Sequence, residues 1–103
     1  MNYEICVIGN EALVFPFLQF GFTTYTPLSD DMLRSYLQEA VTKNYGIIYI
    51  EDSYCFKVKD ILDKYRHKLT PIFIPIGESS DGESFYKQMV NEMMENAIGM
   101  NVI

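Results

Sequence analysis

Four short runs of hydrophobic residues predict the β-strands of this chain. The first, third and fourth runs are rich in β-branched residues and nearly continuous, and the second is weaker. They cover residues 3–8, 22–25, 47–50 and 72–76. Continuous apolar runs, in contrast to alternating ones, are typical of strands that are buried on both faces of a parallel sheet. We therefore expect the first, third and fourth strands to lie inside the protein.

Segments with the spacing of amphipathic helices separate these strands. The longer ones cover residues 30–44, 53–68 and 84–98. Polar residues suited to helix N-caps precede them, and Gly99 follows the last, where a glycine commonly ends a helix. A shorter segment, 12–20, joins the first two strands. Pro16 is expected in its first turn, where the missing amide hydrogen costs least.

The alternation of strands and helices predicts an α/β fold, because such units connect in a right-handed sense into parallel sheets. We expect a small doubly wound, flavodoxin-like domain with a four-stranded parallel sheet, order 2-1-3-4, and helices on both faces. The length of 103 residues suits a single domain. Within it, residues 1–76 form the predicted core and 77–83 a flexible acidic loop. Residues 84–98 form a C-terminal interaction helix that is partly free to bind a partner.

Composition and charge exclude several classes of function. Hydrophobic residues make up 49% of the chain, enough for a core without disulfide or metal support. The net charge of −6 argues against nucleic acid, whose phosphates bind basic surfaces. Apolar runs fall far short of the ~20 residues that span a bilayer. Because the N-terminus also lacks the basic region of a signal peptide, we expect a cytoplasmic protein.

The residue types that bind metals and cofactors are sparse in this chain. Cys6 and Cys55 lack the spacing of a zinc or redox site, and His67 is the only histidine. Gly9, after the first strand, belongs to neither of the glycine-rich phosphate-binding motifs. We therefore expect no metal and no cofactor.

Two residues near the carboxyl ends of the strands, where ligands of such domains bind, suggest enzymatic alternatives. Cys6 would be the nucleophile of a cysteine phosphocarrier similar to phosphotransferase-system IIB proteins, and Asp52 the phosphoryl acceptor of a receiver-like domain. Cys6, however, lies among Ile and Val, where a buried and inert thiol is the simpler interpretation. Asp52 lacks the acidic pair and the lysine that a receiver requires. A role for Asp52 or Ser53 in capping the third helix is therefore favoured.

The third predicted helix is locally basic although the chain as a whole is acidic. Its cationic residues are Lys57, Lys59, Lys64, Arg66 and Lys68. On a helical wheel they spread around the solvent side, so a solvated face is the simpler interpretation. A protein partner with an acidic stripe is the alternative.

The last predicted helix carries an apolar surface that is wider than one sheet can cover. Its apolar residues extend over an arc of ~220° at 100° per residue, whereas a core-facing stripe needs about 100°. Part of this surface should stay exposed and mark an interface, for which flexible methionines are well suited. The alternative is a helix that packs deeply into its own core. The residues expected to bind a partner are Phe85, Met89, Val90, Met93 and Met94.

Four segments, taken in their order and spacing, resemble a known family. They are 5–10 (ICVIGN), 17–22 (FLQFGF), 45–51 (YGIIYIE) and 65–72 (YRHKLTPI), the last together with 97–99 (AIG). In these segments and in length, the chain resembles the F subunit of the bacterial V-type (A/V-type) rotary ATPases. One departure is Leu18, where the family often has an arginine. A contact that this arginine makes in relatives is therefore not carried over to this chain.

The resemblance implies a rotor subunit without an active site of its own. The F subunit belongs to the central stalk and binds the D subunit, which forms the coiled-coil shaft. Through this shaft it connects to the catalytic ring of A and B subunits and to the membrane rotor. It thereby helps couple ATP hydrolysis or synthesis to the transport of H⁺ or Na⁺. A protein in this role is expected in the cytoplasm, peripheral on the inner face of the cell membrane.

Overall fold

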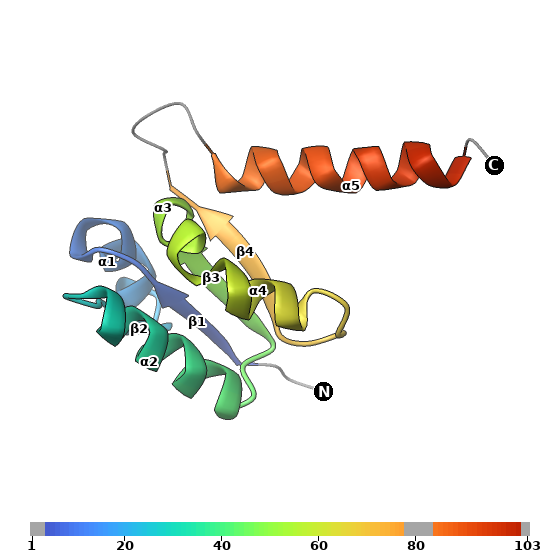
Figure 1. Cartoon of the computed structure of the whole chain (residues 1–103). Helices are drawn as coiled ribbons and strands as arrows, with labels where there is room; N and C mark the ends of the chain where they lie inside the picture. Colours follow the sequence, from blue (N-terminus) through green and yellow to red (C-terminus); the bar gives the residue numbers. More distant parts are fainter. Residues whose placement is uncertain (1–3, 78–83, 102–103) are drawn as a thin grey trace.

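The computed structural model describes residues 4–77 and 84–101 and shows one parallel sheet flanked by helices (Figure 1). The strands lie in the order β2-β1-β3-β4, which confirms the predicted topology and the α/β class. In chain order the elements are β1 (Ile5–Ile8), α1 (Glu11–Gln19), β2 (Thr23–Tyr25), α2 (Asp30–Thr42), β3 (Ile47–Glu51), α3 (Asp52–Cys55), the 3₁₀ helix η1 (Phe56–Val58), α4 (Lys59–Tyr65), β4 (Ile72–Ile76) and α5 (Phe85–Asn101).

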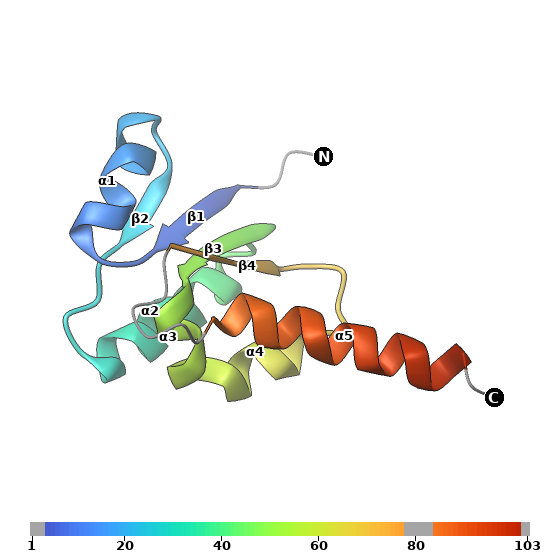
Figure 2. The ribbon, with the colours of Figure 1, turned by 90° about the horizontal axis from the view of Figure 1, so that it is seen from above.

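The two faces of the sheet are covered unequally. Paired residues of neighbouring strands share a face, so Cys6, Ile48 and Phe73 lie on the same side. Helices α2, α3 and α4 cover that side and form the main core with it, and α5 starts there too (Figure 2). Helix α1 covers the opposite side, where Phe17 stacks on Tyr49 with ring centroids 6.0 Å apart. Helices therefore lie on both faces, as predicted.

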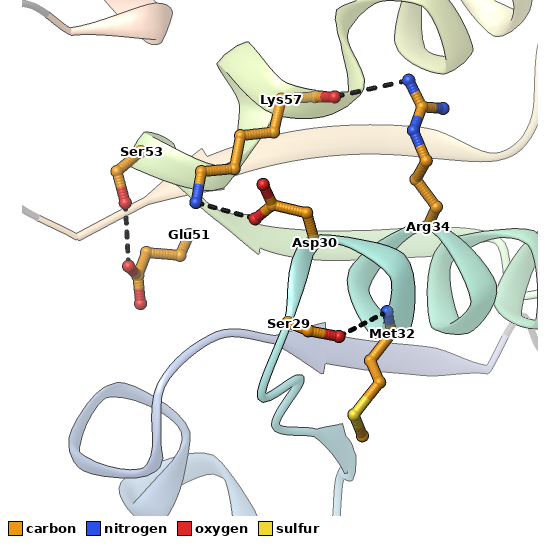
Figure 3. A network of polar contacts seen from close by, with 7 residues as sticks. All are labelled: Ser29, Asp30, Met32, Arg34, Glu51, Ser53 and Lys57. Atoms are coloured by element: carbon orange, nitrogen blue, oxygen red, sulfur yellow. Dashed lines mark hydrogen bonds and ion pairs between the residues drawn. The ribbon is translucent and has the colours of Figure 1, made fainter.

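Helix α2 begins where the sequence predicts. The hydroxyl of Ser29, its N-cap, accepts a hydrogen bond from the backbone N–H of Met32 at 3.2 Å. Its inner face is buried, and Leu37 is fully shielded from solvent. The first turn is also tied to η1, because the ammonium of Lys57 lies 2.9 Å from the carboxylate of Asp30 (Figure 3). A polar cap and an apolar face together determine the position of this helix.

The prediction of a single helix over residues 53–68 is wrong in detail. The structure has three consecutive helical segments there, α3, η1 and α4, and the last of them ends at Tyr65. Cys55 and Val58 are fully buried and Ile61 is 8% exposed. These residues are three apart, a spacing that drifts around an α-helix but stays aligned where the helix tightens to three residues per turn. The 3₁₀ segment therefore keeps one row of side chains on the sheet.

Strand β4 is less buried than its continuous apolar run predicts. In β1, Cys6, Val7 and Ile8 are fully buried, as expected for a central strand. In β4, by contrast, Ile72 is 50% exposed and the other residues are only partly buried. The difference follows from position, because β4 lies at the edge of the sheet and α1 covers the far side over the other strands.

Two helix ends also differ from the prediction. Asn10 caps α1 by accepting a hydrogen bond from the backbone N–H of Leu13 at 3.0 Å, which starts the helix at Glu11. Pro16 is therefore its sixth residue and not in its first turn. Helix α5 continues through Gly99 to Asn101. A glycine permits a helix to end but does not force it to do so while backbone hydrogen bonding continues.

Helix α5 starts in the core and then extends beyond the body of the protein (Figure 1). Phe85 is 8% exposed and meets Phe56 edge to face, with ring centroids 5.3 Å apart. Met89 packs against the same core. Further along, Met93 and Met94 are each 57% exposed. Residues 78–83, which contain most of the predicted acidic loop, lie outside the described residues.

Candidate partner-binding site

Asp52 holds the beginning of α5 against the carboxyl edge of the sheet. Its carboxylate accepts hydrogen bonds from the backbone N–H groups of Phe85 at 2.8 Å and Tyr86 at 3.0 Å. The hydroxyl of Ser84 donates a third bond at 3.3 Å. The first amides of a helix have no partners within the helix, and a negative charge beside them is favourable. Asp52, which is 3% exposed, therefore caps a helix that begins 33 residues later in the chain.

The expectation that Asp52 or Ser53 caps the third helix is therefore wrong. The N-cap of α3 is Glu51, and no side chain makes a capping hydrogen bond there. Glu51 instead accepts hydrogen bonds from the backbone and side-chain amides of Asn10, at 2.9 and 2.6 Å. Its other carboxylate oxygen accepts the hydroxyl of Ser53 at 2.8 Å (Figure 3). The two adjacent acids thus connect β3 to two different helices, α1 and α5.

This arrangement does not favour the receiver-like alternative. The carboxylate of Asp52 is buried, and both of its oxygens already accept hydrogen bonds from the start of α5. In the part of the chain that the structure describes, no three His, Cys, Asp or Glu side chains gather as a metal site would require. Asp52 is accordingly interpreted as a structural cap.

The cysteines lie in the core, which does not favour the phosphocarrier alternative. Cys6 and Cys55 are both fully buried as free thiols. Burial raises the pKa of Cys6 to about 12, because desolvation disfavours the charged thiolate. The pKa of Cys55 is also raised to about 12, first by burial and then by the negative charge of Asp52. A nucleophilic cysteine requires the opposite environment, exposed and electropositive.

The five residues predicted to bind a partner fall, together with Tyr86, into two rows along α5. The inner row faces α4 and the edge of β4, and it consists of Phe85, Met89 and Met93. The outer row lies about 100° further around the helix, and it consists of Tyr86, Val90 and Met94. Tyr86 and Met94 are 52% and 57% exposed, whereas Val90 is half-buried. The sequence left open which residues face the sheet, and the structure places Phe85 and Met89 there.

The sequence interpretation missed several exposed apolar residues. Tyr86 belongs to the outer row, and its place within the wide apolar arc was the signal for it. On α1 and just after it, Phe15, Leu18 and Phe20 are 59%, 53% and 81% exposed. The signal in that segment was the density of apolar residues around the whole helix, because a helix on one face of a sheet can bury only one side.

Taken together, the fold and these surfaces define a class of protein. It is a small doubly wound α/β domain in which the strand-end carboxylates are structural and a helix presents exposed apolar side chains. The chain belongs to the ATP synthase (F/14-kDa) subunit family, whose model matches residues 5–96. This membership confirms the resemblance seen in the sequence. The chain is therefore a subunit of an ATP synthase and not an enzyme that acts alone.

Individual relatives agree with the family over the whole chain. The V-type ATP synthase F subunit of Clostridium perfringens is 20% identical over 103 residues, which cover 100% of this chain and 98% of that protein. The corresponding F subunit of Fusobacterium nucleatum is 23% identical over the same coverage. The crystal structure of the V-type ATP synthase F subunit from Archaeoglobus fulgidus matches with a TM-score of 0.65 and 19% identity. That match covers 75% of this chain and all of the archaeal chain, and it supports the fold.

Proposed function

We propose that this chain is the non-catalytic central-stalk subunit of a V-type rotary ATPase and binds the D subunit, the coiled-coil shaft. The observation that carries the proposal is α5, a helix that is fixed at one end and exposes the apolar side chains of Tyr86, Met93 and Met94. Exposed apolar patches of this kind mark protein interfaces. Relatives that match the full length of the chain are F subunits of V-type ATP synthases, which supports the same role.

The contact has the chemistry of one helix packing against others. In the outer row, Tyr86, Val90 and Met94 are four residues apart and therefore lie on one side of α5. Such rows are the anchors by which amphipathic helices bind each other. Met94, with the exposed Met93 beside it, supplies flexible and polarizable contact surface.

The anchored end of α5 gives this contact a defined orientation. Phe85 is buried beside Phe56, and Asp52 binds the first amides of the helix. These contacts hold the first turn in place before any partner arrives, which lowers the entropy lost on binding. Phe85 thus contributes to the interface by positioning α5, while the exposed residues touch the partner.

The remaining parts of the role follow from this contact. Through the D subunit the chain connects to the ring of A and B subunits and to the membrane rotor, and it helps couple ATP turnover to H⁺ or Na⁺ transport. Among the described residues, the structure has no helix long and apolar enough to cross a membrane. We place the protein in the cytoplasm, peripheral on the inner face of the cell membrane.

Affinity purification of the full chain from its own source tests the proposal. The wild type is expected to recover a coiled-coil shaft protein together with ATPase subunits. Met94→Glu places a charge in the outer row and is expected to weaken binding of the shaft protein by at least tenfold. Asn91→Glu adds the same charge at an exposed polar position of α5 and is the matched control. A wild-type chain that recovers no ATPase component would contradict the proposed function.

A further inference from the structure

A groove separates α5 from α4 and runs over the outer edge of β4. Its volume is about 580 Å³, far larger than a single side chain. The apolar residues that line it come from all three elements and include Leu62, Phe73, Phe85, Met89 and Met93. Part of the inner row of α5 is therefore covered by the protein's own core, and part faces an open apolar space.

The rim of this groove is basic on a protein that is acidic overall. Among the described residues, three of the eight lysine and arginine residues line the groove, whereas two of the eleven acidic residues, Asp63 and Glu92, do so. The basic residues are Lys59, Arg66 and Lys68. One acid, Glu92, lies between two of them, 3.2 Å from Arg66 and 3.9 Å from Lys59. The ammonium of Lys68 lies 4.9 Å from the centre of the Tyr65 ring and has no carboxylate within ion-pair distance among the described residues.

The edge of β4 limits which kind of segment can enter. The backbone N–H of Ile72 points toward β3, where it donates to the carbonyl of Gly46 at 2.9 Å. Because backbone hydrogen-bonding groups alternate in direction along a strand, those of residues 73 and 75 point away from β3, toward the open edge of the sheet. Pro75 has no N–H to donate, so the edge cannot support a ladder of hydrogen bonds with an added strand. A segment that satisfies its own backbone hydrogen bonds, a helix, fits this groove.

We propose that the groove binds an amphipathic helix of the shaft protein whose apolar stripe is flanked by aspartate and glutamate side chains. This inference rests on the proposed function and adds to it a second contact surface with a stated partner chemistry. The apolar stripe packs on Phe73, Met89 and Met93, and the acidic flank faces the basic rim. Because the inner and outer rows share α5, one coiled coil contacts both. The contact on the outer row does not depend on the groove.

Charge reversal at the rim tests the proposed attraction between the basic rim and the acidic flank of the partner helix. The full chain is co-expressed with the shaft protein of its own source, and the affinity of the purified pair is measured at low and high salt. Arg66→Glu/Lys68→Glu is expected to weaken binding at least tenfold at low salt and less at high salt, because screening reduces the repulsion. Lys43→Glu/Lys64→Glu changes the net charge equally at positions that do not line the groove, and it is expected to bind as the wild type does.

Site-specific photo-crosslinking tests whether the partner helix lies in the groove, and this test does not depend on charge. A photoreactive residue at Gln88, which lines the groove, is expected to crosslink to a helical, acid-flanked peptide of the shaft protein. The same residue at Asn91, outside the groove, is the control and is expected not to label that peptide. Circular dichroism of each variant establishes that it is folded.

The outcomes separate this inference from the proposed function. If the wild-type chain binds the shaft protein and Met94→Glu weakens binding, the proposed function stands. If the rim variant then binds as tightly as its control and Gln88 gives no crosslink, the groove proposal is overturned alone. A crosslink from Gln88 to a segment without acidic residues also overturns it. Failure of the wild-type chain to bind the shaft protein overturns both.

Discussion

Two adjacent acids, Glu51 and Asp52, show how the role of a residue depends on what the fold brings to it. The sequence places both at the carboxyl end of the third predicted strand, where a local cap by Asp52 is favoured over a phosphoryl acceptor. In the structure Glu51 accepts two hydrogen bonds from Asn10, and Asp52 accepts the first amides of α5. The carboxyl edge of the sheet is thus occupied by contacts that position helices.

At the residue scale, Asp52→Ala is expected to loosen the start of α5. The change leaves the amides of Phe85 and Tyr86 without an acceptor in a buried place, and it removes a charge that favours the helix N-terminus. The expected decrease in the free energy of unfolding is about 2–3 kcal/mol. Urea denaturation measures it, and hydrogen exchange of these two amides is expected to accelerate.

Asp52→Asn is the informative second variant. It keeps one side-chain oxygen as an acceptor but loses the charge, so its destabilisation should lie between that of the wild type and Asp52→Ala. Unchanged exchange of the Phe85 and Tyr86 amides in Asp52→Ala would show that the carboxylate does not hold α5.

At the scale of elements, polar contacts tie α2 to the broken helix that follows β3. The guanidinium of Arg34 binds both carboxylate oxygens of Asp60, at 2.8 and 3.1 Å, and it donates to the carbonyl of Lys57 at 3.5 Å (Figure 3 shows the latter contact). The hydrogen bond from Arg34, followed by its charge, holds the pKa of the Asp60 carboxyl below its usual value. The pair therefore depends on an ionised Asp60.

Arg34→Gln is expected to lower stability in a way that depends on pH. A carboxyl whose pKa is lower in the folded state contributes stability above its unfolded pKa, near 3.8, and loses it as the pH falls through the folded value. The difference in the free energy of unfolding between wild type and variant should therefore be present at pH 7 and should diminish as the pH falls below about 3.8. It is small, because the pair is exposed to solvent.

Urea denaturation at pH 7 and pH 3 measures this difference. Lys43→Gln breaks the looser pair with Glu39, at 3.8 Å, and serves as the control with a smaller expected effect. A difference between wild type and Arg34→Gln that stays the same at both pH values would contradict the assignment to Asp60.

At the scale of the whole molecule, α5 is both part of the core and a free surface. Phe85 and Met89 pack against side chains of the sheet and of the helices beneath it. Met93 and Met94, one or two turns later, are mostly exposed. The domain thus uses the first part of the helix for its own stability and presents the next part to a partner.

Removal of α5 by ending the chain at residue 77 is expected to leave a folded but weaker domain. The truncation exposes the core beneath Phe85 and leaves Asp52 buried without its donors, so the expected loss is about 3–5 kcal/mol. Thermal unfolding measures it. Met93→Glu/Met94→Glu in the full chain should unfold near the wild-type temperature, because both residues are already exposed. An unchanged midpoint in the truncated chain would contradict the place of Phe85 in the core.

Local signals in the sequence determined the strands, their parallel order, the N-cap at Ser29 and the width of the apolar surface on the last helix. These features follow from the spacing of apolar residues and from caps within one turn, and both are properties of neighbouring residues. The family resemblance also rested on ordered segments along the chain, and the match over residues 5–96 confirms it.

Only the tertiary structure decided which distant groups meet. The cap that Asp52 provides to α5 joins residues more than thirty positions apart, and no local pattern encodes that approach. The break at Val58 likewise depends on how a row of side chains meets the sheet, and the exposure of Ile72 depends on how much of the edge strand the helices cover. The division of α5 into inner and outer rows has the same cause. A helical wheel gives the width of an apolar surface, but only packing determines which side of it is buried.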